Sequence, residues 1–261
     1  MLALLIAAGA CVVVLVAGLV LAVADAVHPS RHSAEHSTPS TGGATAAPGQ
    51  SPGSGPRDAL ASKAMRAVDD AASHPAPVST RDPGTPITLP AATTTGAAQV
   101  PTGFPHTPEG AMAQLAAIDQ VALQSGSLAG AREVITHWAV PGGPTRSSWS
   151  VVQALGILFD EAGLSGGGSS QLALVLTPLM GQIKGSVGQD FVIPCVDFEL
   201  DVTLDQTARG ATADCQRMVW SGGRWMIGPG SEPATPPSVW PDTDLSIEVG
   251  YRDLRQEPQH A

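Results

Sequence analysis

The sequence predicts an α+β fold in which helices come first and a curved antiparallel sheet follows. Between residues 107 and 163, apolar side chains recur every three or four positions, which is the spacing of amphipathic helices. After the triple glycine at 166–168, apolar side chains recur at every second position, as in strands that bury one face. The glycine pair at 222–223 adds the signature of a tight hairpin. Helices followed by a meander of strands favour one α+β roll.

Three helices are expected in the first half of this region. The first covers 107–124, because Thr107 supplies a hydroxyl cap and is followed by proline and an acid. The second covers 127–140, and the third begins at 147 or 148 and stops at Gly163, where glycine can adopt the left-handed capping conformation. The side chains expected in the core are Met112, Leu115, Ala116, Ala122, Leu123, Leu128, Ala131, Ile135, Trp138, Val151, Leu155, Leu158 and Phe159.

Long strands are expected in the second half. The first covers 172–184 with a kink or an edge position at Pro178, and the second covers 192–204. The chain returns over 211–220 and turns into 224–227 through the glycine pair. Two further segments follow: a proline-rich stretch, 228–241, expected to wrap the surface, and a short element that contains Leu245, Ile247 and Val249.

Cys195 and Cys215 are expected to form a disulfide across adjacent strands. With a loop at 204–206, opposing residues have numbers that sum to 410, so the two cysteines face each other, as do Asp201 and Arg209. By the same reasoning, Trp220 faces Trp225 across the glycine hairpin. An isolated cysteine pair of this kind suits an oxidising compartment.

The N-terminal segment, 1–27, is interpreted as a transmembrane signal anchor. Residues 2–23 contain no charged side chain, and roughly 20 such residues cross a bilayer as a helix. A cleaved signal peptide, with Ala24–Asp25–Ala26 as the cleavage site, is the alternative; the long apolar run and the lack of a preceding Lys or Arg favour the anchor. With the cysteine pair, this predicts a single-pass protein of the cell membrane whose C-terminal domain lies outside the cytoplasm.

A disordered stalk is expected over 28–103, which is rich in Pro, Ser, Thr and Gly, with a short helix at 58–72. The folded domain is expected to span 104–251, followed by a disordered tail, 252–261. A chain that begins at Pro101 should therefore fold without the anchor and the stalk.

The formal net charge of −10, from 13 Lys and Arg against 23 Asp and Glu, argues against a nucleic-acid partner, which needs a basic stripe. The expected partners are the membrane, through residues 2–23, and other envelope proteins. The sequence is also compatible with an oligomer. No cofactor and no metal is expected. His28, His32 and His36 lie in a linker, the acids at 197, 199 and 201 suit a solvated strand face, and the triple glycine lacks the lysine of a phosphate loop.

Asp119 is the most informative ionisable residue, because it shares a helix face with Met112, Leu115 and Leu123 and should point at the sheet. A carboxylate in an apolar cavity has a raised pKa, as general acids and bases need. The structural alternative is a buried carboxylate paired with an arginine such as Arg132. On that interpretation, Asp119→Asn should lower thermal stability. His137 is the other weak catalytic candidate.

The chain resembles the NTF2-like fold, also called cystatin-like, over roughly 104–251. The resemblance rests on Thr107-Pro108-Glu109-Gly110 at the start of the helical part and on Gly222-Gly223-Arg224-Trp225-Met226-Ile227 in the closing hairpin. A tethered domain of this fold is also similar to uncharacterised actinobacterial membrane proteins and to the scaffold subunits of conjugation and type IV secretion machines. This analogy implies partners in the cell envelope.

Two functions are consistent with these observations. The first is a membrane-tethered, non-enzymatic interaction or scaffold module, which belongs to a conjugation or secretion complex if the resemblance holds. The alternative is a small-ligand-binding or isomerase- or dehydratase-like enzyme that uses Asp119. We favour the first, because only Asp119 and His137 are available for acid–base chemistry. A filled interior would favour the module, and an open pocket with Asp119 and His137 convergent would favour the enzyme.

Overall fold

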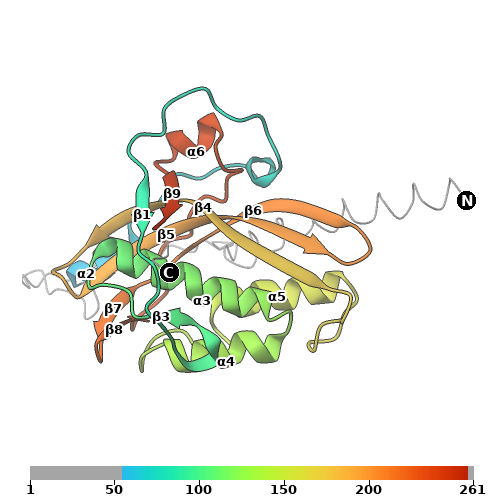
Figure 1. Ribbon diagram of the computed structural model, residues 1–261, viewed down its shortest axis with the longest axis horizontal. Helices are drawn as coiled ribbons and strands as arrows, with labels where there is room; N and C mark the ends of the chain where they lie inside the picture. The colour runs from blue at the N-terminus through green and yellow to red at the C-terminus, as the bar shows by residue number, and fades with distance from the viewer. Residues whose placement is uncertain (1–54, 258–261) are drawn as a thin grey trace, which may run out of the picture.

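The computed structural model describes residues 55–257, which form a curved, largely antiparallel sheet covered on both faces (Figure 1). The strands lie in the order β1 (Ile87–Leu89), β9 (Arg252–Gln256), β4 (Ala173–Ser186), β5 (Phe191–Thr203), β7 (Met218–Ser221) and β8 (Arg224–Ile227). Strand β6 (Thr207–Cys215) pairs with β5 outside this path. Three helices cover one face, and segments from the two ends of the described chain cover the other. The predicted α+β class and the helices followed by a curved antiparallel sheet are confirmed.

The three long helices are α3 (Pro108–Gln124), α4 (Leu128–Trp138) and α5 (Ser150–Glu161). The Thr107 side chain accepts a hydrogen bond from the backbone at the start of α3, as predicted. The Ser127 side chain does the same at the start of α4, where the second helix was expected to begin. The third helix begins two to three residues later than expected, because residues 145–148 form a hydrogen-bonded turn before it. Every predicted core side chain on these helices is buried, except Leu123 and Leu128, which are partly buried.

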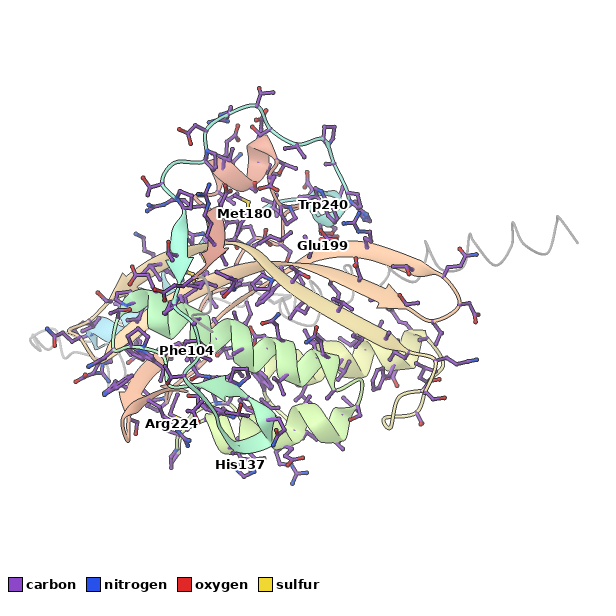
Figure 2. All side chains as sticks on the ribbon, viewed as in Figure 1. Phe104, His137, Met180, Glu199, Arg224 and Trp240 are labelled. Carbon is purple, nitrogen blue, oxygen red and sulfur yellow. A yellow bond between two sulfur atoms is a disulfide. The ribbon has the colours of Figure 1, made fainter. Side chains whose placement is uncertain are left out.

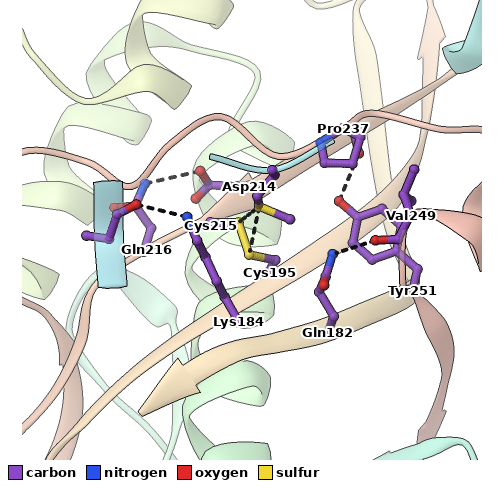
Figure 3. The surroundings of a disulfide bond; sticks show 11 residues. Gln182, Lys184, Cys195, Asp214, Cys215, Gln216, Pro237, Val249 and Tyr251 are labelled. Atoms are coloured by element: carbon purple, nitrogen blue, oxygen red, sulfur yellow. Dashed lines mark hydrogen bonds between the residues drawn. A yellow bond between two sulfur atoms is a disulfide. The ribbon is translucent and has the colours of Figure 1, made fainter. Parts of the chain in front are cut away.

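The sheet is built around the long strands β4 (Ala173–Ser186) and β5 (Phe191–Thr203), which pair antiparallel. The register between them shifts at Pro178, where the sequence predicts a kink, because proline cannot donate to the ladder. Strand β6 (Thr207–Cys215) returns beside β5 in the predicted register. The cysteines therefore face each other with Cα atoms 4.1 Å apart and form the predicted disulfide (Figure 3).

The glycine hairpin links β7 (Met218–Ser221) to β8 (Arg224–Ile227) and pairs Trp220 with Trp225, as predicted. Their ring centroids are 5.3 Å apart in an edge-to-face arrangement, which the aromatic quadrupoles favour. His106 stacks on Trp220 with centroids 4.2 Å apart. The buried Trp225 Nε1 donates to the carbonyl of Pro105 over 2.9 Å, so the hairpin holds the chain as it enters α3.

Residues 55–103, predicted to be a disordered stalk, are part of the fold, and this prediction is wrong over that range. The chain forms α2 (Pro56–Ser62), the short helices η1 (Asp70–Ser73) and η2 (Ala97–Gln99), and the strand pair β2 (Thr94–Thr95) and β3 (Pro101–Thr102). The expected helix at 58–72 is reduced to α2 and the single turn η1. A composition without a core of its own can still add single apolar side chains to a core built by other elements.

The sheet edge shows how this segment is held. Strand β1 (Ile87–Leu89) pairs parallel with β9 (Arg252–Gln256), and β9 also pairs with β4. Leu89 is 1 % exposed. The expected disordered tail is therefore wrong for residues 252–257, because a strand pairing across more than 160 residues leaves no local signal.

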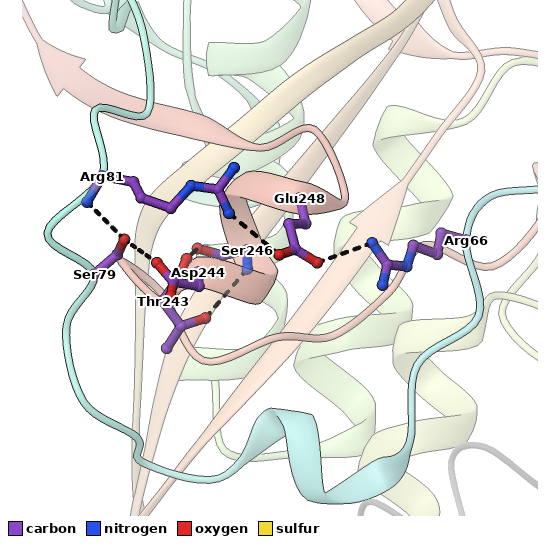
Figure 4. Close-up of polar contacts among 7 residues, drawn as sticks. All are labelled: Arg66, Ser79, Arg81, Thr243, Asp244, Ser246 and Glu248. Carbon is purple, nitrogen blue, oxygen red and sulfur yellow. Dashed lines mark hydrogen bonds and ion pairs between the residues drawn. The ribbon is translucent and has the colours of Figure 1, made fainter.

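The predicted alternation of a buried and a wet face on the second long strand fails over residues 191–198, which are all buried. The side opposite the helices is covered by residues 61–78 and by the proline-rich segment. We name residues 228–243, which are this segment and the two residues after it, the C-terminal strap. As predicted, this segment wraps the domain, and the short element after it is a helix, α6 (Asp244–Glu248). In α6, Glu248 pairs with Arg66 and Arg81, each over 3.2 Å (Figure 4).

The expected anchor, residues 2–23, and the three histidines of the linker lie outside the described residues. Within 55–257, no helix has both the length and the apolar character needed to span a bilayer.

Candidate functional site

Asp119 lies on the face of α3 that packs against the sheet, as the helical spacing predicts. It is 1 % exposed, and neither of its carboxyl oxygens has a hydrogen-bond partner among the described residues. Arg132, the expected partner, instead donates from Nε to the carbonyl of Arg146 over 3.3 Å. The predicted ion pair of Asp119 is therefore wrong. Arg132 is only half-buried and is not among the side chains that α4 buries.

Two further carboxyl groups lie within electrostatic reach of Asp119. Asp214 stands opposite Val196 in the β5–β6 register, so the Asp214 and Val196 side chains lie on the same face of the sheet, the one toward α3. Glu232 belongs to the C-terminal strap. The amide of the buried Gln216 joins these two acids: its Nε2 donates to Asp214 Oδ1 over 3.2 Å and to Glu232 Oε1 over 3.5 Å. We name Asp119, Asp214 and Glu232 the acid cluster.

The electrostatics of the acid cluster follow from burial without a counter-charge. Burial raises the pKa of Asp119 well above its usual value, and the charges of Asp214 and Glu232 raise it further. Burial, together with Glu232, raises the pKa of Asp214 to about 7. Burial also raises the pKa of Glu232, opposed by a hydrogen bond of 3.1 Å from the backbone N of Ser150 at the start of α5. The fold therefore shifts each of these groups toward its protonated form.

His137, the second catalytic candidate, is not brought near Asp119. It lies in the last turn of α4 with an exposed side chain, on the side of the helices away from the sheet (Figure 2). Tyr251, the only tyrosine, is buried and donates from its hydroxyl to the carbonyl of Pro237 over 2.8 Å. The interior between α3 and the sheet is filled by aromatic and aliphatic side chains, including Trp138, Phe159 and Phe198.

The three acids predicted to line a wet strand face have different environments. Asp197 is completely buried and accepts a hydrogen bond of 3.4 Å from the backbone N of Val239 in the strap; burial raises its pKa well above the usual value. Glu199 and Asp201 lie nearer the surface, and both pair with Arg209. The predicted pairing of Asp201 with Arg209 is thus confirmed. The described residues contain no group of His, Cys, Asp and Glu placed to hold a metal ion.

A surface groove of about 460 Å³ lies at α2, and no member of the acid cluster lines it. It is lined by residues that include Arg57, Asp58, Phe191 and Arg217. Arg57 lies over the ring of Phe191 at 4.9 Å, and the charge of Arg217 is engaged by Asp58. Neither Asp119 nor His137 lines this groove, so it does not make them accessible to a substrate.

Sequence reasoning missed Asp214, Gln216 and Glu232. A signal for Asp214 existed, because the register that pairs the cysteines also turns Asp214 toward the helices. Glu232 lies in a proline-rich loop with no periodicity, so nothing local places it.

Comparison of the chain with protein-family models, with curated proteins and with solved structures finds no match. The arrangement of the residues must therefore carry the functional argument. A carboxyl group sealed from solvent cannot reach a substrate as a general acid or base. Its protonation instead makes the stability of the fold depend on pH.

Proposed function

We propose that the domain is a non-catalytic interaction module that works outside the cytoplasm on a membrane anchor formed by residues 2–23. The observation that carries the extracytoplasmic location is the disulfide between Cys195 and Cys215, since such bonds persist in oxidising compartments. The filled interior supports a binding role over catalysis.

The proposal extends to the fold and to the machine. Helices α3 to α5 followed by a curved antiparallel sheet and a glycine hairpin support an NTF2-like roll. A tethered roll outside the membrane is the layout that supports a scaffold role in a conjugation or secretion envelope complex. This last step is an analogy of fold and topology.

The test uses the full-length chain in intact cells. A photo-crosslinking side chain is placed at Val78 or Val175, which are 69 % and 48 % exposed. We expect an adduct with another envelope protein whose yield depends on the position, and protease added outside the cells should remove the domain. The same adduct should form in the Asp119→Asn variant, because a sealed carboxyl group does not contribute to the surface.

Two results would overturn the proposal. The domain could be protected from external protease in intact cells and digested only after lysis, which would place it in the cytoplasm. Alternatively, a small ligand could co-purify with the wild-type chain and not with Asp119→Asn, which would favour the enzyme.

A further inference from the structure

The C-terminal strap (228–243) passes from one face of the sheet to the other around the outer edge of β6. On the helix side, Glu232 accepts from the backbone N of Ser150. At the edge, the backbone N of Ala213 donates to Ser238 Oγ over 3.0 Å. On the far side, the backbone N of Trp240 donates to the carbonyl of Ala72 over 2.7 Å.

Acids meet the strap on both faces: Asp197 is completely buried, whereas Asp214 and Glu232 are half-buried, and hydrogen-bond donors to them are few. Glu232 and Asp214 share the single amide of Gln216, and Asp214 Oδ2 has no partner among the described residues. On the other face, Asp197 receives one long hydrogen bond from Val239, and its Oδ2 has no partner there either. Burial of an ionised carboxylate needs compensating donors or a cation, which these contacts do not supply.

We propose that the C-terminal strap is controlled by protons: it packs on the sheet while Asp214, Glu232 and Asp197 are neutral and loosens when they ionise. A neutral carboxyl group can still accept from Nε2 of the shared Gln216 amide, and it carries no charge that the closed strap would have to desolvate. Once ionised, Asp214 and Glu232 repel each other, and all three groups need hydration that the closed strap denies them.

Lys184 lies beside the strap: its Nζ donates over 2.9 Å to the carbonyl of Ala61, which also accepts from the backbone N of Ala234. Within the strap, burial and the charge of Asp253 raise the pKa of Asp242, so Asp242 acts in the same direction as the other acids.

The two arginines against the strap are paired with other acids. Arg217 holds the start of the strap, donating from Nε to Ser231 O over 2.8 Å and from Nη1 to Pro229 O over 3.2 Å, while it pairs with Asp58. Arg209 lies over the ring of Trp240 at 5.2 Å but pairs with the acids at 199 and 201.

Asp119, on α3, adds a third acid on the helix side of the sheet. On the opposite side of the sheet, the Tyr251 hydroxyl donates to the strap. No Lys, Arg or His within residues 55–257 forms an ion pair with Asp119, Asp197, Asp214 or Glu232. The start of the strap is therefore pinned by Arg217, whereas the rest depends on protonation.

The sign of the effect follows from the pKa shifts. The pKa of Asp214 is about 7 in the fold, and those of Glu232 and Asp197 are also raised, mainly by burial. Groups with raised pKa values keep the strap closed at low pH. This stabilisation is lost as the pH rises from the ordinary pKa of each group to its pKa in the fold. For Asp214, the loss is therefore complete a little above pH 7.

Hydrogen–deuterium exchange of the full-length chain tests the proposal at pH 5 and pH 7.5. Each rate is divided by the intrinsic exchange rate at that pH. We expect protection of the strap to fall about tenfold or more between the two conditions, the equivalent of one pKa unit of differential protonation. Protection of the β7–β8 hairpin, 218–227, should change by less than about twofold, because the hairpin contains none of the acids invoked for the strap.

Three variants locate the effect. Asp214→Asn/Glu232→Gln should lose the pH response over 228–235, and Asp197→Asn should lose it over 236–243. The matched control, Asp205→Asn/Glu257→Gln, removes two exposed acids and should keep the full response. The proposal fails if the strap and the hairpin of the wild-type chain respond equally to pH, a comparison that needs no variant to fold. It also fails if both Asp variants retain the full response.

Discussion

Asp119 is a buried carboxyl group on α3, and neither of its oxygens has a hydrogen-bond partner among the described residues. Its direction follows from helical periodicity, which places it with Met112 and Leu115 on the face toward the sheet. Its environment does not follow from the sequence of α3, because the neighbouring charges come from β6 and from the strap. The absence of a basic partner among the described residues reverses the expected effect of its substitution.

We predict that Asp119→Asn stabilises the protein at neutral pH. The wild-type fold must keep Asp119 protonated above the ordinary pKa of aspartate, and an amide removes this cost while conserving shape. The difference in unfolding free energy should be near zero at pH 4 and should grow by at most about 1.4 kcal/mol per pH unit above it. Urea unfolding at several pH values measures this difference. If the variant were less stable than the wild-type protein at pH 7, the prediction would be wrong, and Asp119 would make an ionic hydrogen bond that the structure does not show.

At the scale of elements, the disulfide ties β5 to β6 beside Met65, Tyr251 and the strap (Figure 3). We predict that Cys195→Ala/Cys215→Ala lowers the unfolding free energy by about 3 kcal/mol, because the bond closes a loop of 20 residues in the unfolded chain. Calorimetry with and without a reductant measures the loss. The wild-type protein should fall to the level of the double variant when reduced, and the double variant should not respond to the reductant.

The pairing of β1 with β9 makes a second prediction at this scale. A chain that begins at Pro101 lacks α2 and β1, so it should lose cooperative folding, whereas a chain that begins at Gly55 should retain it. This reverses the expectation from composition.

A substitution tests the same point without truncation. Leu89→Ala should destabilise the protein by about 2–5 kcal/mol, as for other buried leucines. The matched control, Val78→Ala, removes an exposed side chain from the same segment and should change stability by less than about 0.5 kcal/mol. Equal effects of the two substitutions would mean that residues 55–100 do not contribute to the core.

The whole molecule combines several acids whose pKa values are raised, and this sets its response to pH. Burial raises the pKa of Asp119, Asp197, Asp214 and Glu232, so each contributes stability at low pH that is lost as pH rises through its folded value. Asp58 acts in the opposite direction, because its hydrogen bond with Arg217 lowers its pKa.

We therefore predict that the urea midpoint of the full-length chain is higher at pH 5 than at pH 7.5, with little change in the slope of the transition. A formal net charge of −10 adds to this trend, since self-repulsion grows as the acids ionise. A midpoint that rises toward pH 7.5 would mean that donors or a bound cation compensate the buried acids.

Local patterns in the sequence determined the elements and their register. Thr107 and Ser127 mark two helix starts, Gly222 and Gly223 mark the hairpin, and the loop after residue 204 together with the cysteine pair sets the register of β5 with β6. Each of these depends on residues close together in the chain, where capping, turn geometry and side-chain periodicity act directly.

Only the tertiary structure decided which surfaces are covered and which charges meet. The burial of Asp197 requires the strap, and the acid cluster requires α3, β6 and the strap together. Likewise, β1 is ordered by β9, more than 160 residues later. Contacts of this kind leave no local trace, because the free energy that places one segment comes from apolar surface and backbone partners supplied by distant ones.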